Sequence, residues 1–327
     1  MTEKALRLLA VLLAALFVLA GAAAAESIKV GFISRDLNYL PFFVGQKKGF
    51  YAAEGLQVDL VFIGRPDLQL QAVVAGELHF ANFNPDGIIL WNEKGGSPLK
   101  VVAGVTNAAP YYLIGAKNYK KVDDLKGTRI GVASLTGGAT SILVSYLKTK
   151  GLQHPRDFNM VIISGGTPAR LTALESGAIA AGILGIPFGD MAIDRGLNKL
   201  GDTTEVISHY QFNAVNVSPA WAERNRSTVV KFIKAHIRSL RWIYESPDQT
   251  ADFLAKELGV KPPYGKVGAE YYIRNKIYPI DGSVTLDGLK VNIQVQANDG
   301  FLKEPLPPPE KYVDLNYLKQ AQKELGL

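Results

Sequence analysis

The amino-acid sequence predicts an α/β protein made of two lobes with the same local plan. Apolar segments with strand character alternate with helical segments up to about residue 217, as in sheets covered by helices. Residues 29–32 (KVGF) resemble residues 129–132 (RIGV), and residues 68–81 resemble residues 169–182. In each pair the second segment lies about 100 residues after the first. Chance recurrence of strand and glycine patterns is the alternative, but the nearly constant offset favours two copies of one plan.

The first copy begins with a strand, a loop and a helix. Alternating apolar residues at 28–32 predict the strand, and Pro41 suits a first helical turn because its missing N–H costs nothing there. Gly49 and Gly55 can take the left-handed conformations that end helices. The loop at 34–40 then lies at the carboxyl end of the first strand, where open α/β sheets bind ligands.

The remaining elements follow from the same signals. Buried strands are expected at 56–62, 99–105, 111–114, 129–132, 160–163, 179–184 and 212–217. Helices are expected at 66–75, 85–93, 138–150, 168–176 and 187–195, several of them beginning at proline and followed by glycine. After Ser218 the pattern is helical only, with Ser227 as an expected N-cap before an apolar stripe that includes His236.

Residues 1–25 have the pattern of a cleavable signal peptide. Lys4 and Arg7 precede an apolar run at 8–20, and alanines at 23–25 offer a cleavage site. The run is short for a membrane span, so an uncleaved anchor is the weaker alternative. The signal predicts export to the periplasm.

Composition excludes several kinds of site. The sequence holds no cysteine, which excludes disulfides, thiolate metal sites and lipid attachment at an N-terminal cysteine. Its four histidines lack metal-motif spacing, and no phosphate-binding loop or nucleophile elbow occurs. We therefore expect no cofactor, no metal and no catalytic residue. The net charge of +6 favours anions, but the 36 basic residues are dispersed, so we expect no nucleic-acid partner.

The strongest candidate for ligand contact is the glycine-rich entry to the helix at 138–150. A helix N-terminus presents unpaired N–H groups and a partial positive charge. Gly138 lets an anion approach these amides, and the hydroxyls of Ser134, Thr136 and Thr140 can add hydrogen bonds. An ordinary capped helix is the alternative.

A similar arrangement recurs at 164–171, where Gly166 and Thr167 open the next helix. Two helix N-termini would then face one crevice, with Phe188 as a possible wall. In the first copy, Asn82 and Asn84 follow a strand and could orient a polar ligand, although Asn84 could equally cap a helix.

The first loop supplies the opposite wall of the expected crevice. Arg35 could pair with an acidic group of a ligand, or it could be a solvated charge. Asn38 could hydrogen-bond, and Tyr39 could stack on a flat ligand or pack beneath the loop.

Three segments resemble a known family. They are the pattern P-x-x-x-G-x-x-x-G-[FY]-[FY]-x-x-x-G-L-x-V at 41–58, the stretch 123–132 with the following Thr136, Gly138 and Thr140, and 171–187. Together they are similar to periplasmic substrate-binding proteins of ABC importers, in the group that binds nitrate, sulfonates, taurine and thiamine precursors. One departure is His79, where relatives often carry Asp.

The resemblance implies a type II periplasmic-binding-protein fold, with two three-layer α/β lobes joined by two crossover segments. Lobe one would hold 26–107 and 217–327, and lobe two 108–216. Such a monomer would bind a small, anionic solute and deliver it to an ABC permease and ATPase complex. A receptor for a sensor kinase or chemoreceptor is the alternative. A thiamine-pyrimidine-related binder or enzyme is weaker, since the enzymes resembled need a cysteine-rich segment.

Overall fold

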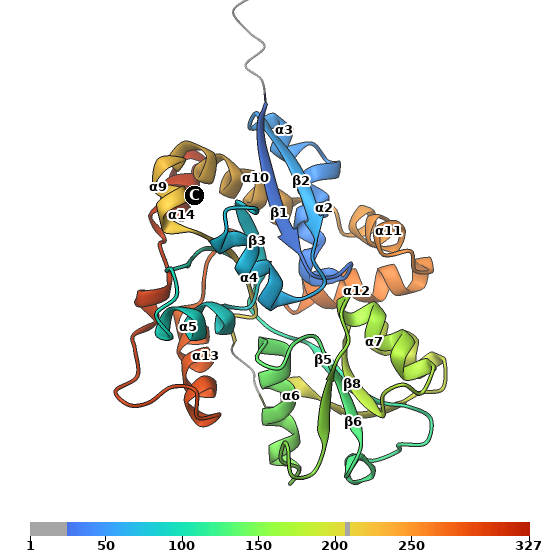
Figure 1. Cartoon of the computed structure of the whole chain (residues 1–327). Coiled ribbons are helices and arrows are strands. Elements are labelled where there is room, and N and C mark those ends of the chain that lie inside the picture. Colours follow the sequence, from blue (N-terminus) through green and yellow to red (C-terminus); the bar gives the residue numbers. More distant parts are fainter. Residues whose placement is uncertain (1–24, 207–209) are drawn as a thin grey trace, which may run out of the picture.

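Two five-stranded sheets organise the molecule (Figure 1). The computed structural model describes residues 25–206 and 210–327, so residues 1–24 of the expected signal sequence lie outside the described part. The first sheet has the order β2-β1-β3-β10-β4 and the second β7-β6-β8-β5-β9. Their strands are β1 (Glu26–Phe32), β2 (Leu56–Phe62), β3 (Phe80–Phe83), β4 (Lys100–Thr106), β5 (Tyr111–Gly115), β6 (Arg129–Val132), β7 (Asn159–Ile162), β8 (Ala181–Gly185), β9 (Asn198–Asp202) and β10 (Asn213–Val217).

The two sheets repeat one topology. In each, a central strand is parallel to two neighbours, β1 to β2 and β3, and β6 to β7 and β8. An antiparallel strand follows in each, β10 beside β3 and β5 beside β8. The predicted two-lobed α/β fold is therefore confirmed, and the internal repeat marks equivalent strands.

Helices cover both faces of each sheet. Phe232 and Ile233 pack with Ile28 on one face of the first sheet, and Leu70 and Ile88 lie in the cluster on the other face. In the second sheet α6 covers one face, and α7 and α8 the other. The helices are α2 (Leu40–Lys47), α3 (Phe50–Ala53), α4 (Pro66–Val74), α5 (Pro85–Glu93), α6 (Gly138–Thr149), α7 (Gly166–Glu175), α8 (Phe188–Asp194), α9 (Pro219–Arg224), α10 (Arg226–Glu245), α11 (Pro247–Leu258), α12 (Pro262–Arg274), α13 (Leu286–Asn298) and α14 (Asn316–Glu324).

The chain crosses between the sheets twice. It leaves the first sheet after β4 and returns to it at β10. The two crossings touch each other, because Phe212 N donates to the carbonyl of Thr106 at 3.0 Å. The expected boundary between 216 and 217 falls inside β10, which pairs with β3 and β4. We therefore propose that the return crossover ends before Asn213.

The C-terminal helices bridge the lobes beside the crossovers. On α12, Tyr272 belongs to an apolar cluster that joins Leu37 of the first lobe to Ile186 of the second. On α13, Val295 packs with the cluster around α6. The described lobes are therefore in contact on both sides of the crossovers.

One local expectation needs correction, one strand was not predicted, and one expectation is confirmed. Ser227 is not an N-cap, because α10 starts at Arg226 with Asn225 as its cap. Strand β9 was not expected, since its sequence NKLGD is polar. His236 is a packed core residue as expected, fully buried with Nε2 2.9 Å from the carbonyl of Gly104.

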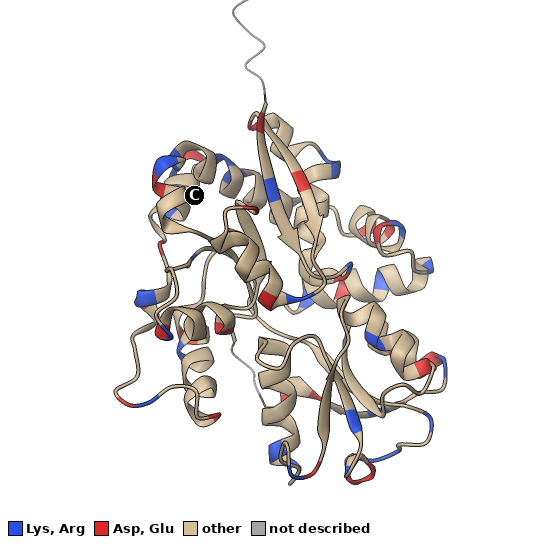
Figure 2. Ribbon diagram, viewed as in Figure 1, with Lys and Arg blue, Asp and Glu red and all other residues tan. Residues whose placement is uncertain are grey.

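The described surface carries mixed charge. Lysines and arginines are interspersed with acidic residues over the helices and loops of both lobes (Figure 2). Among the described residues, no helix is both long and apolar enough to cross a bilayer. Within the same residues, no group of three or more acidic, histidine or cysteine side chains could hold a metal ion.

Candidate ligand-binding site

A cavity of about 60 Å³ lies between the two lobes. The loop after β1 lines it with Ser34, Asp36 and Asn38, and the second lobe lines it with residues at the start of α6 and α7. These segments follow β1, β6 and β7, so the walls come from the carboxyl ends of parallel strands.

Two helix N-termini converge on this cavity. Gly138 and Ala139 begin α6, and Gly166 and Thr167 begin α7. The first amides of a helix have no partner within the helix, and they carry the positive end of its dipole. The arrangement therefore favours an acceptor or an anion in the cavity.

Arg170 places a full positive charge at the same cavity. Its side chain is 3% exposed, and Nε donates to the carbonyl of Ile183 at 2.9 Å. Nη2 donates to Thr167 Oγ1 at 3.4 Å. Both partners are neutral, and Arg170 forms no ion pair with any carboxylate of the described residues. The buried Asp36 carboxyl interacts with this charge from beyond ion-pair distance. A buried guanidinium that forms no direct ion pair is costly, so an anionic ligand would be favoured beside it.

Asp36 is the acidic residue of the cavity lining. Burial raises the pKa of its carboxyl, which the Ser34 hydroxyl, the Asn38 amide and the Arg170 charge each lower in part. The side chain caps a 3-10 helix by accepting from Asn38 N at 3.0 Å. This capping role accounts for a carboxyl at this place.

Unpartnered polar groups line the cavity as well. Ser34 Oγ is buried and has no hydrogen bond of acceptable geometry, although it lies near Asp36. Asn213 Nδ2 is also buried without a hydrogen bond of acceptable geometry among the described residues, although the Asn213 side chain lies near the Tyr39 hydroxyl. Both can donate, and buried donors without partners cost free energy until a ligand or water satisfies them.

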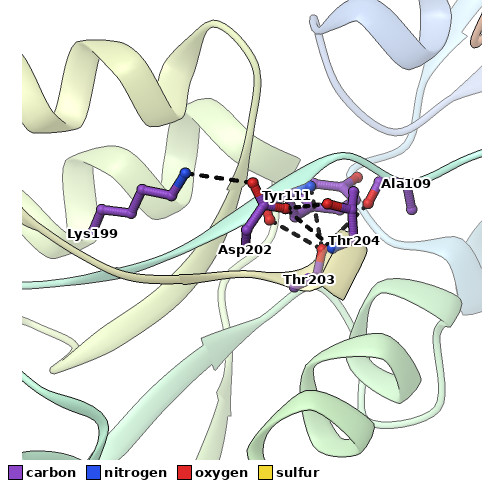
Figure 3. A network of polar contacts seen from close by, with 6 residues as sticks. All are labelled: Ala109, Tyr111, Lys199, Asp202, Thr203 and Thr204. Carbon is purple, nitrogen blue, oxygen red and sulfur yellow. Dashed lines mark hydrogen bonds and ion pairs between the residues drawn. The ribbon is translucent and has the colours of Figure 1, made fainter. Parts of the chain in front are cut away.

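Tyr39, Tyr111 and Phe212 form aromatic walls. The backbone of Tyr111 is held by Thr203, whose Oγ1 lies 3.0 Å from the Tyr111 carbonyl and 3.3 Å from its N–H (Figure 3). The Tyr111 hydroxyl accepts from Asn38 Nδ2 at 3.2 Å, a contact between the lobes. The Thr203 contacts therefore fix the position of a wall residue.

Glycines let the lobes approach closely around the cavity. A Cβ on Gly138 would lie 2.2 Å from Asn84 Cγ, and one on Gly166 would lie 2.3 Å from Ser34 Cβ. Any larger residue at either position would push the lobes apart. The structure therefore shows the lobes closed on each other.

Most residues predicted for the site gather there. The cavity is lined by Asn38, Tyr39, Asn84, Gly138, Thr140, Gly166 and Thr167. Ser134 and Thr136 line an adjoining groove instead. Asn84 also caps α5, since its Oδ1 accepts from Asp86 N at 2.8 Å. Asn82 lies behind the wall, where Nδ2 donates to the carbonyl of Asn38 at 2.9 Å.

Three other residues singled out in the sequence lie away from the cavity lining. The Arg35 side chain is 56% exposed and pairs with Glu257 on α11. Phe188 is buried in the core beneath α8. His79 accepts from Lys29 N at 3.0 Å through Nδ1 and stacks on Trp221, outside the cavity.

Four further residues line the cavity that were not predicted from the sequence: Arg170, Asp36, Tyr111 and Asn213. Arg170 stands inside the repeated segment 169–182, where the first copy has Gln69. The replacement of a neutral glutamine in the first copy by a charged arginine in the second was the signal that could have identified Arg170 as a site residue. Asp36 was in the expected loop, whereas nothing local distinguishes Tyr111 from a buried strand residue.

Comparison with known proteins agrees with the fold. Residues 36–250 match the family described as NMT1/THI5 like, which is more than half of the chain. The chain belongs to the NMT1/THI5-like family. The resemblance noted from the segments at 41–58, 123–132 and 171–187 is confirmed at this level, and the fold is that of type II periplasmic binding proteins.

Named relatives of this NMT1/THI5-like protein are distant. The riboflavin-binding protein RibY of Chloroflexus aurantiacus is 23% identical over 66% of this chain, a match that spans only 62% of RibY itself. The nitrate-binding protein NrtA from Synechocystis PCC 6803 superposes with a TM-score of 0.75 at 14% identity, covering 92% of this chain and 89% of NrtA. The alkanesulfonate-binding protein SsuA from Xanthomonas axonopodis pv. citri gives 0.71 at 15%, covering 89% and 99%. At such identities the structural likeness shows the fold alone.

Proposed function

We propose that this protein is a periplasmic solute receptor that captures a small anion between its lobes and delivers it to an ABC permease and ATPase complex. The observation that carries the proposal is Arg170, a buried cation in a cavity between the lobes whose hydrogen-bond partners are both neutral and which forms no direct ion pair. The names of RibY, NrtA and SsuA support a binding role over catalysis. The signal pattern at 1–25 supports export.

Arg170 would hold the charged group of the solute. Ile183 and Thr167 use two of the five guanidinium N–H donors, so three remain for acceptors on the solute. Amides at the start of α6 and α7 would complete the coordination from the second lobe. Ser34 and Asn213 would contribute donors from the first lobe and the return segment.

Capture by this site is a shift of population between open and closed lobes. A solute that contacts both lobes stabilises the closed arrangement by its differential affinity for that arrangement. The two crossover segments would act as the hinge. The two lobes of one chain line the cavity from both sides, so capture needs no residue of a second copy and we propose that the protein acts as a monomer.

A thermal-shift screen tests capture. Nitrate, methanesulfonate, acetate and taurine are compared with choline and glycerol at matched ionic strength. An anion at 100 times its Kd should stabilise the protein by about 2.7 kcal/mol. Stabilisation by choline or glycerol alone would show that the site does not select anions.

Delivery is tested separately with membrane vesicles from the source organism that contain its ABC permeases and ATPases. We expect uptake of the captured anion to require added protein. Uptake that is the same without it would remove the import role and leave capture intact.

A further inference from the structure

A second hollow adjoins the interlobe cavity, and we call it the side groove. Its volume is about 170 Å³, and it lies between α4 and α5 of the first lobe and the loop before α6. Leu70, Phe83, Leu90 and Trp91 give it an apolar lining. Of its charged lining residues, Asp67 is paired with Arg65 at 2.5 Å and Lys94 is exposed. The groove is thus suited to an apolar group.

The side groove and the interlobe cavity share Pro66, Asn84, Gly137 and Gly138 in their linings. These four residues separate the two hollows, and we call them the partition. Pro66 and Asn84 belong to the first lobe and the two glycines to the second, so the partition lies where the lobes touch. A Cβ on Gly137 would lie 3.5 Å from Pro66 Cγ, which is ordinary contact. A slight opening of the lobes therefore joins the two hollows.

Ser134 adds an independent sign of a ligand. It is 4% exposed, lines the side groove, and its Oγ has no partner among the described residues. The hydroxyl also lies near the partition, since a Cβ on Gly137 would be 2.6 Å from it. A molecule that passes the partition could satisfy this buried hydroxyl.

We propose that the solute is an elongated anion whose charged end binds at Arg170 and whose apolar end packs in the side groove against Leu70, Leu90 and Trp91. The inference rests on the proposed capture of an anion. The occupant is the ligand's own apolar end, because the groove continues from the interlobe cavity across the partition. A ligand with its apolar end in the side groove would contact α4 and α5 of the first lobe and the loop before α6 of the second.

Gly87 on α5 offers a way to fill the side groove without touching the interlobe cavity. It is half-buried, and a Cβ there would lie 3.6 Å from Leu70 Cδ1 and 3.9 Å from Phe83, which is ordinary contact. Gly87→Leu therefore occupies the groove. Gly87→Ala is the matched control, since it has the same backbone effect but leaves most of the space.

Calorimetric titration with two homologous series tests the proposal. The probes are n-alkanesulfonates from methanesulfonate to octanesulfonate, and n-alkanoates from acetate to octanoate. In the native protein we expect affinity to rise about fourfold per buried carbon until the groove is full. Gly87→Leu should weaken the long members at least tenfold and leave the shortest members unchanged. Gly87→Ala should resemble the native protein, and binding of the shortest members reports that each variant is folded.

Trp91 gives a second readout from inside the groove. Long-chain members should change tryptophan emission, and Trp91→Phe should remove that change. Trp221→Phe and Trp242→Phe should keep it, because these two residues lie outside the groove lining.

The outcomes separate this inference from the proposed function. Equal affinity along both series would overturn the elongated anion and leave capture standing. A chain-length gain that survives Gly87→Leu would overturn it too, because the apolar end would lie elsewhere. Failure of every member, including the shortest, would overturn anion capture and this inference together.

Discussion

The two lobes repeat a core but not a site. Gln69 in α4 and Arg170 in α7 stand at equivalent positions of the internal repeat, and both are buried. Gln69 Nε2 donates to the carbonyl of Ile63 at 3.2 Å, and Arg170 Nε to that of Ile183 at 2.9 Å. The first lobe thus fills this position with a neutral amide, whereas the second fills it with a cation.

The packing around these positions is otherwise alike. Gly31 and Gly131 are equivalent, and a Cβ on either would lie within 2.6 Å of Leu78 or Ile179 respectively. The side chain that precedes β3 or β8 packs closely over the central strand, which favours glycine at both places. The comparison teaches that the fold constrains the repeated core positions, while the buried cation at this position is present in the second lobe and absent from the first.

Replacing Arg170 by the glutamine that the first lobe has at the equivalent position should have the largest effect on anion binding. Arg170→Gln removes the buried cation, and we expect anion affinity to fall at least a hundredfold, or about 3 kcal/mol. Titration with the tightest anion of the screen measures it. Arg35→Gln is the control, because Arg35 is exposed and pairs with Glu257, and its affinity should stay within twofold. The reverse ranking would place charge recognition in the first loop instead.

Acid should weaken the first lobe through His236. Burial lowers its pKa from 6.5 to about 4. The unfolded chain then binds more protons between these values, so stability is present above pH 6.5 and falls as pH decreases to about 4, by about 3 kcal/mol.

Denaturant unfolding of His236→Gln across this pH range measures that loss as a difference from the native protein. The difference is needed because burial raises the pKa of Asp86 to about 6, which has the opposite effect on stability. His154→Gln is the control in the second lobe, since His154 is exposed. An unchanged pH slope in His236→Gln would show that His236 does not cause the acid response.

Closure between the lobes should depend on Gly166. Its φ is +70°, and a Cβ would lie 2.3 Å from Ser34 Cβ. We expect Gly166→Ala to weaken anion binding about thirtyfold, or about 2 kcal/mol, because the lobes cannot meet. Gly177→Ala separates strain from contact, since its φ is +72° but its Cβ would meet nothing within 4 Å. Equal binding losses in both variants would mean that backbone strain, and not lobe contact, is responsible.

The sequence was sufficient to predict the strands and helices of the repeated core, but it was insufficient to predict Arg170 as the buried cation of the cavity. Apolar periodicity with Pro and Gly signals located β6 and α5 with the bounds that the structure has. The same local signals mark the starts of helices, so they also predicted Gly138 and Gly166, which line the cavity. The Arg35 side chain pairs with Glu257, which is far from it in the sequence. Apolar periodicity reports only local structure, so it could not predict that Arg35 lies away from the cavity.

The wall residue Tyr111 provides the smallest test. Thr203 Oγ1 lies within hydrogen-bond distance of the carbonyls of Ala109 and Tyr111 and the N–H of Tyr111 (Figure 3). Thr203→Val keeps the shape but leaves these groups unpaired, so we expect stability to fall by about 1 kcal/mol and anion affinity about threefold. Thermal unfolding and titration measure the two effects. In Thr204→Val, which loses only a bond to Asp202, affinity should not change. If it weakens binding equally, the effect belongs to the whole turn, and the second lobe does not fix its aromatic wall through Thr203.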